Sequence, residues 1–254
     1  MKKFFTLLAT VILLTAVLTT SFALTAEQIM DKAVSENSKF KTQKIEMQMI
    51  IQKKNATDKK YDLVIYVYNK SADQKYAFVR FTYPQSIKGM SFLSLGKNKE
   101  YVYMPAYHRV QRIAGSSKNS KFAGSDFTYS DLSLLYSQKE DGSYSLLSED
   151  SHEYVIEIKP NVSDSQYSKL IMTIDKTHFL PIKVEFYKDG KLYKTMESSG
   201  LENVDGRWLF KEISLTMADN SSKTLITLKN TKFDLNIPPS FFSVRTLFMP
   251  VIKY

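Results

Sequence analysis

The 254-residue chain has no cysteine and only three histidines. The absence of cysteine excludes disulfides, thiolate metal sites and cysteine nucleophiles. The histidines lie far apart in the sequence, at His108, His152 and His178, so no metal site is expected. The chain also lacks a Gly-x-Ser-x-Gly motif, a phosphate-binding glycine loop and a dinucleotide fingerprint. These absences predict a protein that is not an enzyme, with no catalytic residue, metal or cofactor.

A segment long enough to span a membrane is missing as well. The longest apolar run, 4–18, has about fifteen residues, against the roughly twenty that a bilayer requires. It follows Lys2 and Lys3 and precedes the small residues Ser21 and Ala23, which is the pattern of a secretory signal peptide. We expect residues 1–23 to be a signal peptide and the mature chain to be soluble in the periplasm, without a lipid anchor.

The charge is unbalanced toward lysine and arginine. The formal net charge is +9, or +7 once Lys2 and Lys3 are removed with the signal peptide. A basic surface attracts anionic lipid headgroups, acidic partners or nucleic acid, and export makes nucleic acid the least expected of the three. Lys88, Arg109 and Arg112 are the predicted residues for docking a headgroup or a partner. An ordinary solvated set of lysines remains the alternative.

Short apolar-aromatic runs broken by glycine and proline predict an antiparallel sheet. One amphipathic helix is expected at 25–34, capped by Thr25, and a second, short one at 131–136. Asp189-Gly190 is a typical two-residue hairpin turn. No linker divides the chain, so a single, monomeric domain over 24–254 is predicted. The expected strands are 45–52, 61–68, 76–83, 90–95, 100–104, 144–148, 154–159, 169–175, 181–188, 191–198, 207–216 and 223–234.

Several of these strands are apolar on both faces. In 61–68, for example, Leu63, Ile65 and Val67 share one face while Val64 and Tyr66 share the other. So wide a sheet is expected to curl strongly and to fill its hollow with helices, side chains or a ligand. A pocket for lipid or lipoprotein acyl chains is predicted, although an ordinary sandwich core would give the same pattern. Its predicted lining is Met47, Met49, Leu63, Ile65, Val67, Phe78, Phe92 and Tyr101.

A succession of motifs resembles the outer membrane lipoprotein-sorting protein family of the LolA/LolB-like superfamily. The motifs are 76–84, 87–93, 101–105, 109–113 and 124–132, followed by the closing segment 233–239 with its Pro-Pro pair. The resemblance implies a mainly β fold, in which a strongly curved antiparallel sheet forms an incomplete barrel with short helices as a lid over an apolar cavity.

For function, the resemblance implies a carrier that takes acyl chains of lipids or lipoproteins across the periplasm. Its partners would be an inner-membrane transporter and an outer-membrane acceptor. The alternative is a sensor or accessory module of the same fold that binds a membrane transporter or a regulatory protein.

Overall fold

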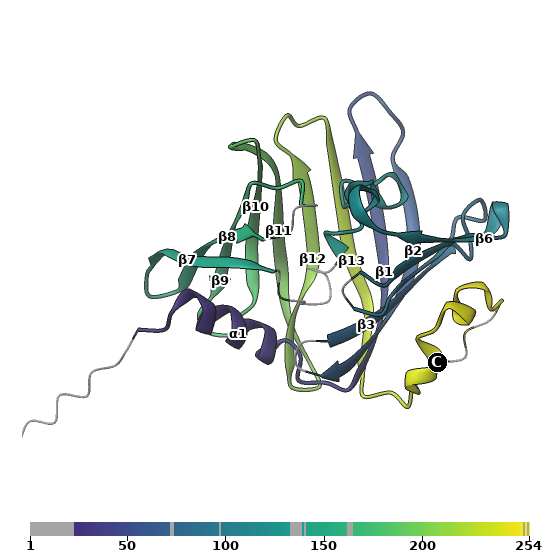
Figure 1. The fold of residues 1–254 in the computed structure, drawn as a ribbon, viewed down its shortest axis with the longest axis horizontal. Helices are drawn as coiled ribbons and strands as arrows, with labels where there is room; N and C mark the ends of the chain where they lie inside the picture. The colour runs from purple at the N-terminus through teal and green to yellow at the C-terminus, as the bar shows by residue number, and fades with distance from the viewer. Residues whose placement is uncertain are drawn as a thin grey trace, which may run out of the picture.

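The computed structural model describes residues 23–250 except 72–73, 97, 133–138, 140 and 162–164, together with residues 252 and 254. The predicted signal peptide and most of the predicted 131–136 helix therefore lie outside the described residues. No helix in the described part is long and apolar enough to cross a bilayer. Within that part the protein is a single 13-stranded antiparallel sheet with one α-helix and several 3-10 turns (Figure 1).

The helix α1 (Ala26–Glu36) confirms the predicted helix and its cap. The Thr25 hydroxyl accepts a hydrogen bond from the Gln28 amide, and the Gln28 side chain accepts one from the Thr25 amide. This reciprocal capping box satisfies two backbone donors that a helix start leaves free. The helix buries Ile29, Met30 and Ala33 against the sheet.

The order of the strands in the sheet is set by the pairing of the first strand, β1, with the last, β13. The first strand pairs with the last at the centre, so the sheet has two wings, β2 to β6 and β12 to β7, in the order β6-β5-β4-β3-β2-β1-β13-β12-β11-β10-β9-β8-β7. The predicted strands are all present, and β6 is the one that the sequence analysis missed. The bounds are β1 (Thr42–Lys53), β2 (Lys59–Ser71), β3 (Gln74–Tyr83), β4 (Ser91–Ser94), β5 (Glu100–Met104), β6 (Arg109–Ile113), β7 (Gly142–Glu149), β8 (Glu153–Pro160), β9 (Lys169–Asp175), β10 (Pro181–Lys188), β11 (Lys191–Val204), β12 (Arg207–Met217) and β13 (Ser222–Phe233).

The predicted strong curl is wrong. The edge strands β6 and β7 each have one neighbour, so the sheet stays open, and it is not strongly curled into an incomplete barrel. The chain covers both faces by itself instead. One face, here called the inner face, lies under α1 and the crossover that leads from β6 toward β7. The opposite, outer face of β2 to β5 lies under the C-terminal segment, residues 234–250 and 252. Covering both faces in this way removes the need for curling.

The C-terminal segment explains why β2 and β3 are apolar on both sides. Tyr66 and Phe78 point to the outer face, where they pack on Phe241 with ring centroids 5.1 and 5.2 Å apart. Phe242 and Leu247 complete this second core. The segment contains η4 (Pro239–Phe241) and η5 (Val244–Phe248). An apolar surplus that suggested a cavity is thus partly used to hold the chain's own end.

Arg80 fastens this segment to the sheet. Its buried guanidinium donates to the hydroxyl of Ser91 at 2.9 Å and to the carbonyls of Thr246 and Leu247, both at 2.9 Å. It also donates to the carbonyl of Met249. Four hydrogen bonds from one planar guanidinium therefore hold residues 246–249 against the sheet.

We expect Arg80→Gln to release the C-terminal segment. Buried carbonyls left without a donor cost about 1–3 kcal/mol each, so the free energy of unfolding should fall by about 2–4 kcal/mol and trypsin should cleave faster after Arg245. Arg112→Gln is the matched control, since that exposed guanidinium donates to one carbonyl, that of Asn98. Unchanged cleavage in Arg80→Gln would show that the apolar contacts hold the segment without the arginine.

Lys75 provides a pH-dependent test of the inner face. Burial lowers the pKa of this β3 lysine to about 8, and its side chain is 2% exposed. Between pH 8 and its unfolded pKa near 10.4, the unfolded chain binds more protons than the folded one, so stability rises with pH across this window. Relative to Lys75→Met, the wild type should gain on the order of 2–3 kcal/mol from pH 8 to 10.4, measured by urea unfolding. If the difference in unfolding free energy between the wild type and Lys75→Met did not change with pH, the lowered pKa of a buried Lys75 would be contradicted.

Candidate functional site

The inner face of the first wing is one continuous apolar row. The strand register aligns Ile45 with Ile65, Ile65 with Val79, and Val79 with Phe92. Six of the eight residues predicted to line a pocket are buried on this face, namely Met47, Met49, Leu63, Ile65, Val67 and Phe92. The strand alternation thus brings most of the predicted lining together.

Phe78 and Tyr101 belong to the opposite face. Phe78 pairs with Tyr66 and Leu93, and Leu93 pairs with Tyr101, which is the row that the C-terminal segment covers. A single pocket lined by all eight predicted residues is therefore not what the sheet builds. Successive residues of a strand face opposite sides, and the sequence alone did not show which side of β3 faced inward.

The crossover fills the inner face. We call residues 121–132 the plug, because its side chains Phe122, Phe127 and Leu132 close over Met47, Met49, Leu63 and Ile65 and leave an enclosed space of about 10 Å³. Phe122 also packs on Phe81 with centroids 5.4 Å apart. The predicted pocket residues are thus in contact with a part of the chain rather than with a free cavity.

The tip of the plug is a tight reversal. Ala123 and Gly124 both adopt the left-handed conformation, with φ of 50° and 76°. The amide of Phe122 donates to the carbonyl of Phe127 at 2.8 Å, and the Ser125 hydroxyl donates to the carbonyl of Phe122 at 2.7 Å. Ser125 is fully buried, and the hydrogen bond from its hydroxyl to the Phe122 carbonyl holds the turn together.

Buried charges lock the plug to the second wing. The ammonium of Lys194, on β11, lies 2.6 Å from the Asp131 carboxylate and donates to the carbonyl of Asp126 at 2.9 Å. The Asp131 carboxylate also accepts from the Tyr167 hydroxyl at 2.8 Å and from the Thr128 amide at 2.6 Å. We call this group the latch. Lys194 and Asp131 are 1% and 2% exposed, so the pair is shielded from water.

Asp126 is held separately, by β13. Its carboxylate accepts from Ser222 at 2.5 Å and from Thr224 at 2.8 Å, while its amide donates to the Thr224 hydroxyl at 3.0 Å. The half-exposed Lys121 ammonium lies 3.6 Å from it. Two carboxylates thus face two ammonium groups, which balances the charge under the plug.

Burial shapes the protonation of the latch. It lowers the pKa of Lys194, while Asp131 acts in the opposite direction and favours the charged ammonium. Burial and the neighbouring Asp131 carboxylate raise the pKa of Tyr167, so its hydroxyl stays a donor. A buried pair of this kind gives little net stability, yet breaking it is expensive because one charge is left alone.

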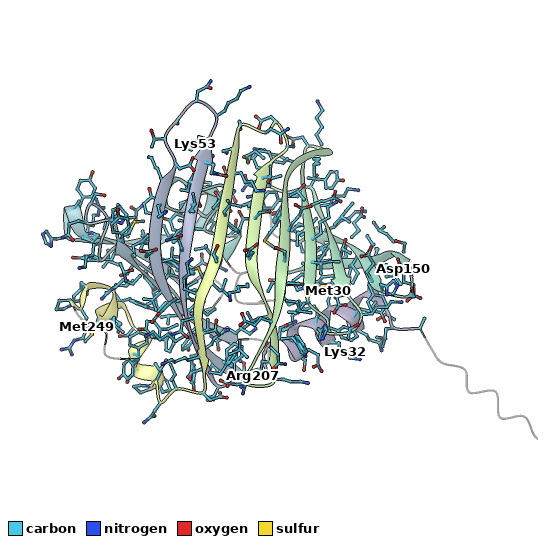
Figure 2. The ribbon with its side chains drawn as sticks, turned by 180° about the vertical axis from the view of Figure 1, so that it is seen from behind. Met30, Lys32, Lys53, Asp150, Arg207 and Met249 are labelled. Atoms are coloured by element: carbon cyan, nitrogen blue, oxygen red, sulfur yellow. The ribbon has the colours of Figure 1, made fainter. Side chains whose placement is uncertain are left out.

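Beside the plug, the sheet splits. The β12–β13 ladder runs only from Glu212–Thr227 to Thr216–Lys223, although β12 continues to Arg207 and β13 to Phe233. The gap forms an open pocket of about 130 Å³, here called the mouth, between the end of α1, β1 and the β11–β12 hairpin. Figure 2 shows Arg207 at this lower end of the sheet, and it lines the pocket together with Glu36 and Asn37 at the end of α1. Its apolar lining includes Phe40, Ile45, Met47, Met196, Trp208, Phe210, Ile226 and Phe233.

The mouth and the plugged space are neighbours. Met47 and Ile226 line both of them. Trp208, 44% exposed, stands at the mouth and packs on His178 with ring centroids 4.5 Å apart. At the foot of the split, Arg207 pairs with Asp234 at 2.5 Å and so ties the hairpin to the end of β13. An apolar path therefore leads from the mouth toward the plug, because Met47 and Ile226 line both spaces.

A larger space of about 680 Å³ lies along the outer face of β9 to β13. Charged and hydroxyl side chains line it, among them Lys183, Glu197, Glu212 and Lys223. Such a surface does not suit an acyl chain. Among the described residues, no three histidine or acidic side chains gather as metal ligands would.

The predicted docking cations do not form one group. Lys88 and Arg109 are exposed at the same end of β3 to β6, because the 84–89 loop meets η1 (Pro105–Tyr107), and only His108 separates η1 from Arg109. Arg112 instead donates to the Asn98 carbonyl at 2.9 Å, at the β4–β5 turn. The sequence analysis did not identify Lys194, which belongs to the latch, or Trp208, which lines the mouth. Lys194 stands two residues before Met196, so strand alternation marked it as an inward-facing charge.

We expect Lys194→Met to lower the free energy of unfolding by about 3–5 kcal/mol, since Asp131 would remain as an unpaired buried charge. Hydrogen exchange across 121–132 should speed up in the same protein. Lys191→Met, an exposed lysine on the same strand, is the control. In Lys194→Met/Asp131→Asn the loss should be smaller than the sum of the single losses. Additive losses would contradict a coupled latch.

Solved structures share this fold. An outer membrane lipoprotein-sorting protein domain from Vibrio parahaemolyticus is 22% identical, with a TM-score of 0.81 over 89% of this chain and 98% of its own. A DUF1329 family protein from Desulfovibrio piger is also 22% identical, with a TM-score of 0.78 over 89% and 100% of the two chains. A LolA superfamily protein from Nitrosomonas europaea is 21% identical, with a TM-score of 0.70 over 88% and 100%.

These identities establish the fold alone, and they confirm the resemblance at that level. No curated protein matches the sequence significantly. A family model described as an uncharacterized protein matches residues 73–248, which include the plug, the latch and most of the sheet. The chain belongs to this family and has the fold of the LolA superfamily.

Proposed function

We propose that the protein is a non-enzymatic periplasmic carrier that binds acyl chains of lipids or lipoproteins on the inner face of the sheet. The observation that carries the proposal is the shared lining of two spaces, since Met47 and Ile226 belong both to the open mouth and to the plugged core. An acyl chain that enters at the mouth would reach the plug next. The plug would then leave the inner face as the chain takes its place.

The volumes of the two spaces support the proposal that the plug moves. The mouth holds about 130 Å³, below the roughly 300–1,000 Å³ typical of ligand pockets. Removing Phe122, Phe127 and Leu132 from the core would free the space over Met49, Leu63 and Ile65. Each buried methylene of an acyl chain contributes about 0.8 kcal/mol, so a chain can replace the apolar contacts that the plug gives up.

The residue types suit an irregular apolar guest. Met47, Met49 and Met196 are flexible thioethers that repack around different shapes, and they lie along the path from the mouth to the plug. Val67 belongs to the same apolar face, and Phe92 continues that face under the plug, where its ring packs on Phe122 and Tyr129. The carrier would act as a monomer between an inner-membrane transporter and an outer-membrane acceptor.

Trp208 gives a direct test, because it is the one tryptophan of the chain and stands at the mouth. Stearate brominated along its chain should quench Trp208 emission on binding, whereas unbrominated stearate should not. Leu147→Ser is the control: this residue is exposed on β7, remote from the mouth, and its substitution should leave the quenching unchanged. Equal emission with both stearates would contradict entry at the mouth.

The plug itself can be locked, since the chain has no cysteine of its own. Asp126 and Thr224 are already in hydrogen-bond contact, so Asp126→Cys/Thr224→Cys places two thiols between the plug and β13. The oxidised protein should lose acyl-probe binding by about tenfold or more, a change of about 1.4 kcal/mol, and the reductant should restore it. The single-cysteine variants are the controls. Full binding by the oxidised protein would show that the plug need not move.

Carrier and sensor differ in what happens after binding. A carrier gives up its acyl chain to an acceptor, so a fluorescent acyl probe bound to the protein should move to acceptor vesicles. A sensor that binds a transporter or a regulatory protein need not release it. Probe that stays bound despite excess vesicles would favour the sensor.

A further inference from the structure

A surface patch remains after the plug, latch and mouth have been assigned. It lies at one end of β3 to β6, where large apolar side chains stay exposed. Tyr107 is 75% exposed, Phe248 52% and Met249 42%. Exposed groups of this size, gathered in one place, mark an interaction surface.

Three segments far apart in the sequence build this patch. A Cβ placed on Gly89 would lie 3.6 Å from the Pro105 side chain, which puts the 84–89 loop against η1. The Tyr103 ring, on β5, lies 6.3 Å from the Phe248 ring, so η5 packs beside the same strand end. Arg80 binds both Ser91 and the Met249 carbonyl and so holds the C-terminal part in place. The patch is therefore a fixed surface rather than a free tail.

The charges around the patch have one sign. Lys88, Arg109 and Arg245 are exposed there, and none of them pairs with a carboxylate in the described part of the chain. Between residues 75 and 125 the only acidic residue is Glu100, and the closing segment 235–254 has none. Glu100 is 8% exposed and pairs with Ile113 at the far end of β5. The neighbouring strand β2 carries Asp62 opposite Tyr83, where its carboxylate accepts a hydrogen bond from Gln48. The segments that form the patch themselves present no exposed carboxylate to a negatively charged surface.

Aromatic and methionine side chains beside lysine and arginine match the boundary of a lipid bilayer. Aromatic rings settle at the headgroup level, and cations near an anionic membrane gain about 1 kcal/mol each. A stable protein interface needs roughly 20–30 residues a side, whereas this patch offers a handful. The composition and the size both favour a lipid surface over a protein partner.

We propose that this patch docks the protein on an anionic phospholipid bilayer. Tyr107, Phe248 and Met249 enter the headgroup region, while Lys88, Arg109 and Arg245 bind the lipid phosphates. This goes beyond the acyl-chain site and does not depend on it, because the mouth lies between β12 and β13, away from β3 to β6 in the strand order. Figure 2 shows Met249 near one side edge of the molecule and Arg207 at the lower end.

The test is flotation of the full mature chain with vesicles of phosphatidylcholine, with or without phosphatidylglycerol, at low and high salt. The wild type should float with the anionic vesicles, less so at high salt because exposed charges are screened. Lys88→Gln and Arg109→Gln should each weaken binding about fivefold. Tyr107→Ser/Phe248→Ser should weaken it at both salt concentrations.

Two variants on the other wing serve as matched controls. Lys191→Gln removes an exposed cation and Leu147→Ser an exposed apolar side chain, 50% exposed, from places outside the patch. Both should float as the wild type does. Equal losses in the patch and control variants would overturn the proposal, as would equal binding to uncharged vesicles or no binding to either. Binding of a purified acidic protein, lost in Lys88→Gln/Arg109→Gln while flotation is unchanged, would overturn it in favour of a protein partner.

The acyl-probe affinity separates this proposal from the carrier function. Lys88→Gln/Arg109→Gln should bind a fluorescent fatty acid as the wild type does, because neither residue lines the mouth or the plugged space. A protein that floats but binds no probe would support docking and contradict the carrier, and a protein that binds probe without floating would do the reverse.

Discussion

The pairing of β1 with β13 is the constraint on which the rest of the structure depends. Because the first and last strands meet at the centre, the chain runs outward to β6 and must then cross the whole sheet to begin again at β7. The crossover passes over the inner face, where the apolar row from Ile45 to Phe92 would otherwise lie open. The plug is thus a consequence of the topology. A connection that had to exist was given apolar side chains and became part of the core.

The latch follows from the same crossing. In its described part the crossover consists of turns and short 3-10 helices, which leave backbone and side-chain polar groups under the sheet, and buried polar groups need partners. Asp126 finds them on β13 and Asp131 on β11, so one short segment is bonded to a central strand and to a strand of the second wing. The apolar surface that the plug covers belongs largely to the first wing and β1. The plug therefore joins the two wings, with apolar contacts to one and polar bonds to the other.

Sequence patterns predicted where the strands and the helix lie better than they predicted which side of each strand faces inward. Alternation located the strands, and the Thr25 cap located α1, because both signals are local. β6 escaped since Arg109–Ile113 carries two arginines and a glutamine and has no apolar alternation. Phe78 and Tyr101 were assigned to the wrong side because β3 is apolar on both, and the C-terminal segment that covers its outer face lies about 160 residues away in the chain. The latch was missed because its partners meet only in three dimensions. Alternation with Met196 places Lys194 on the inward side of β11, but nothing local in the sequence shows that Asp131 lies opposite it.

In the proposed carrier, the energetics of the latch would determine how the plug opens. An ion pair that is taken out of water gains little over an apolar replacement, but separating its partners inside the protein is costly. Lys194 stays on its strand, so when the plug leaves, Asp131 must reach water or another cation at the same time as Lys194 does. Partial opening would expose neither charge fully and would have the highest free energy. The plug is therefore expected to be either seated or released, with few intermediate positions, and in the proposed carrier an apolar guest that replaced Phe122 and Phe127 would shift the balance between these two states.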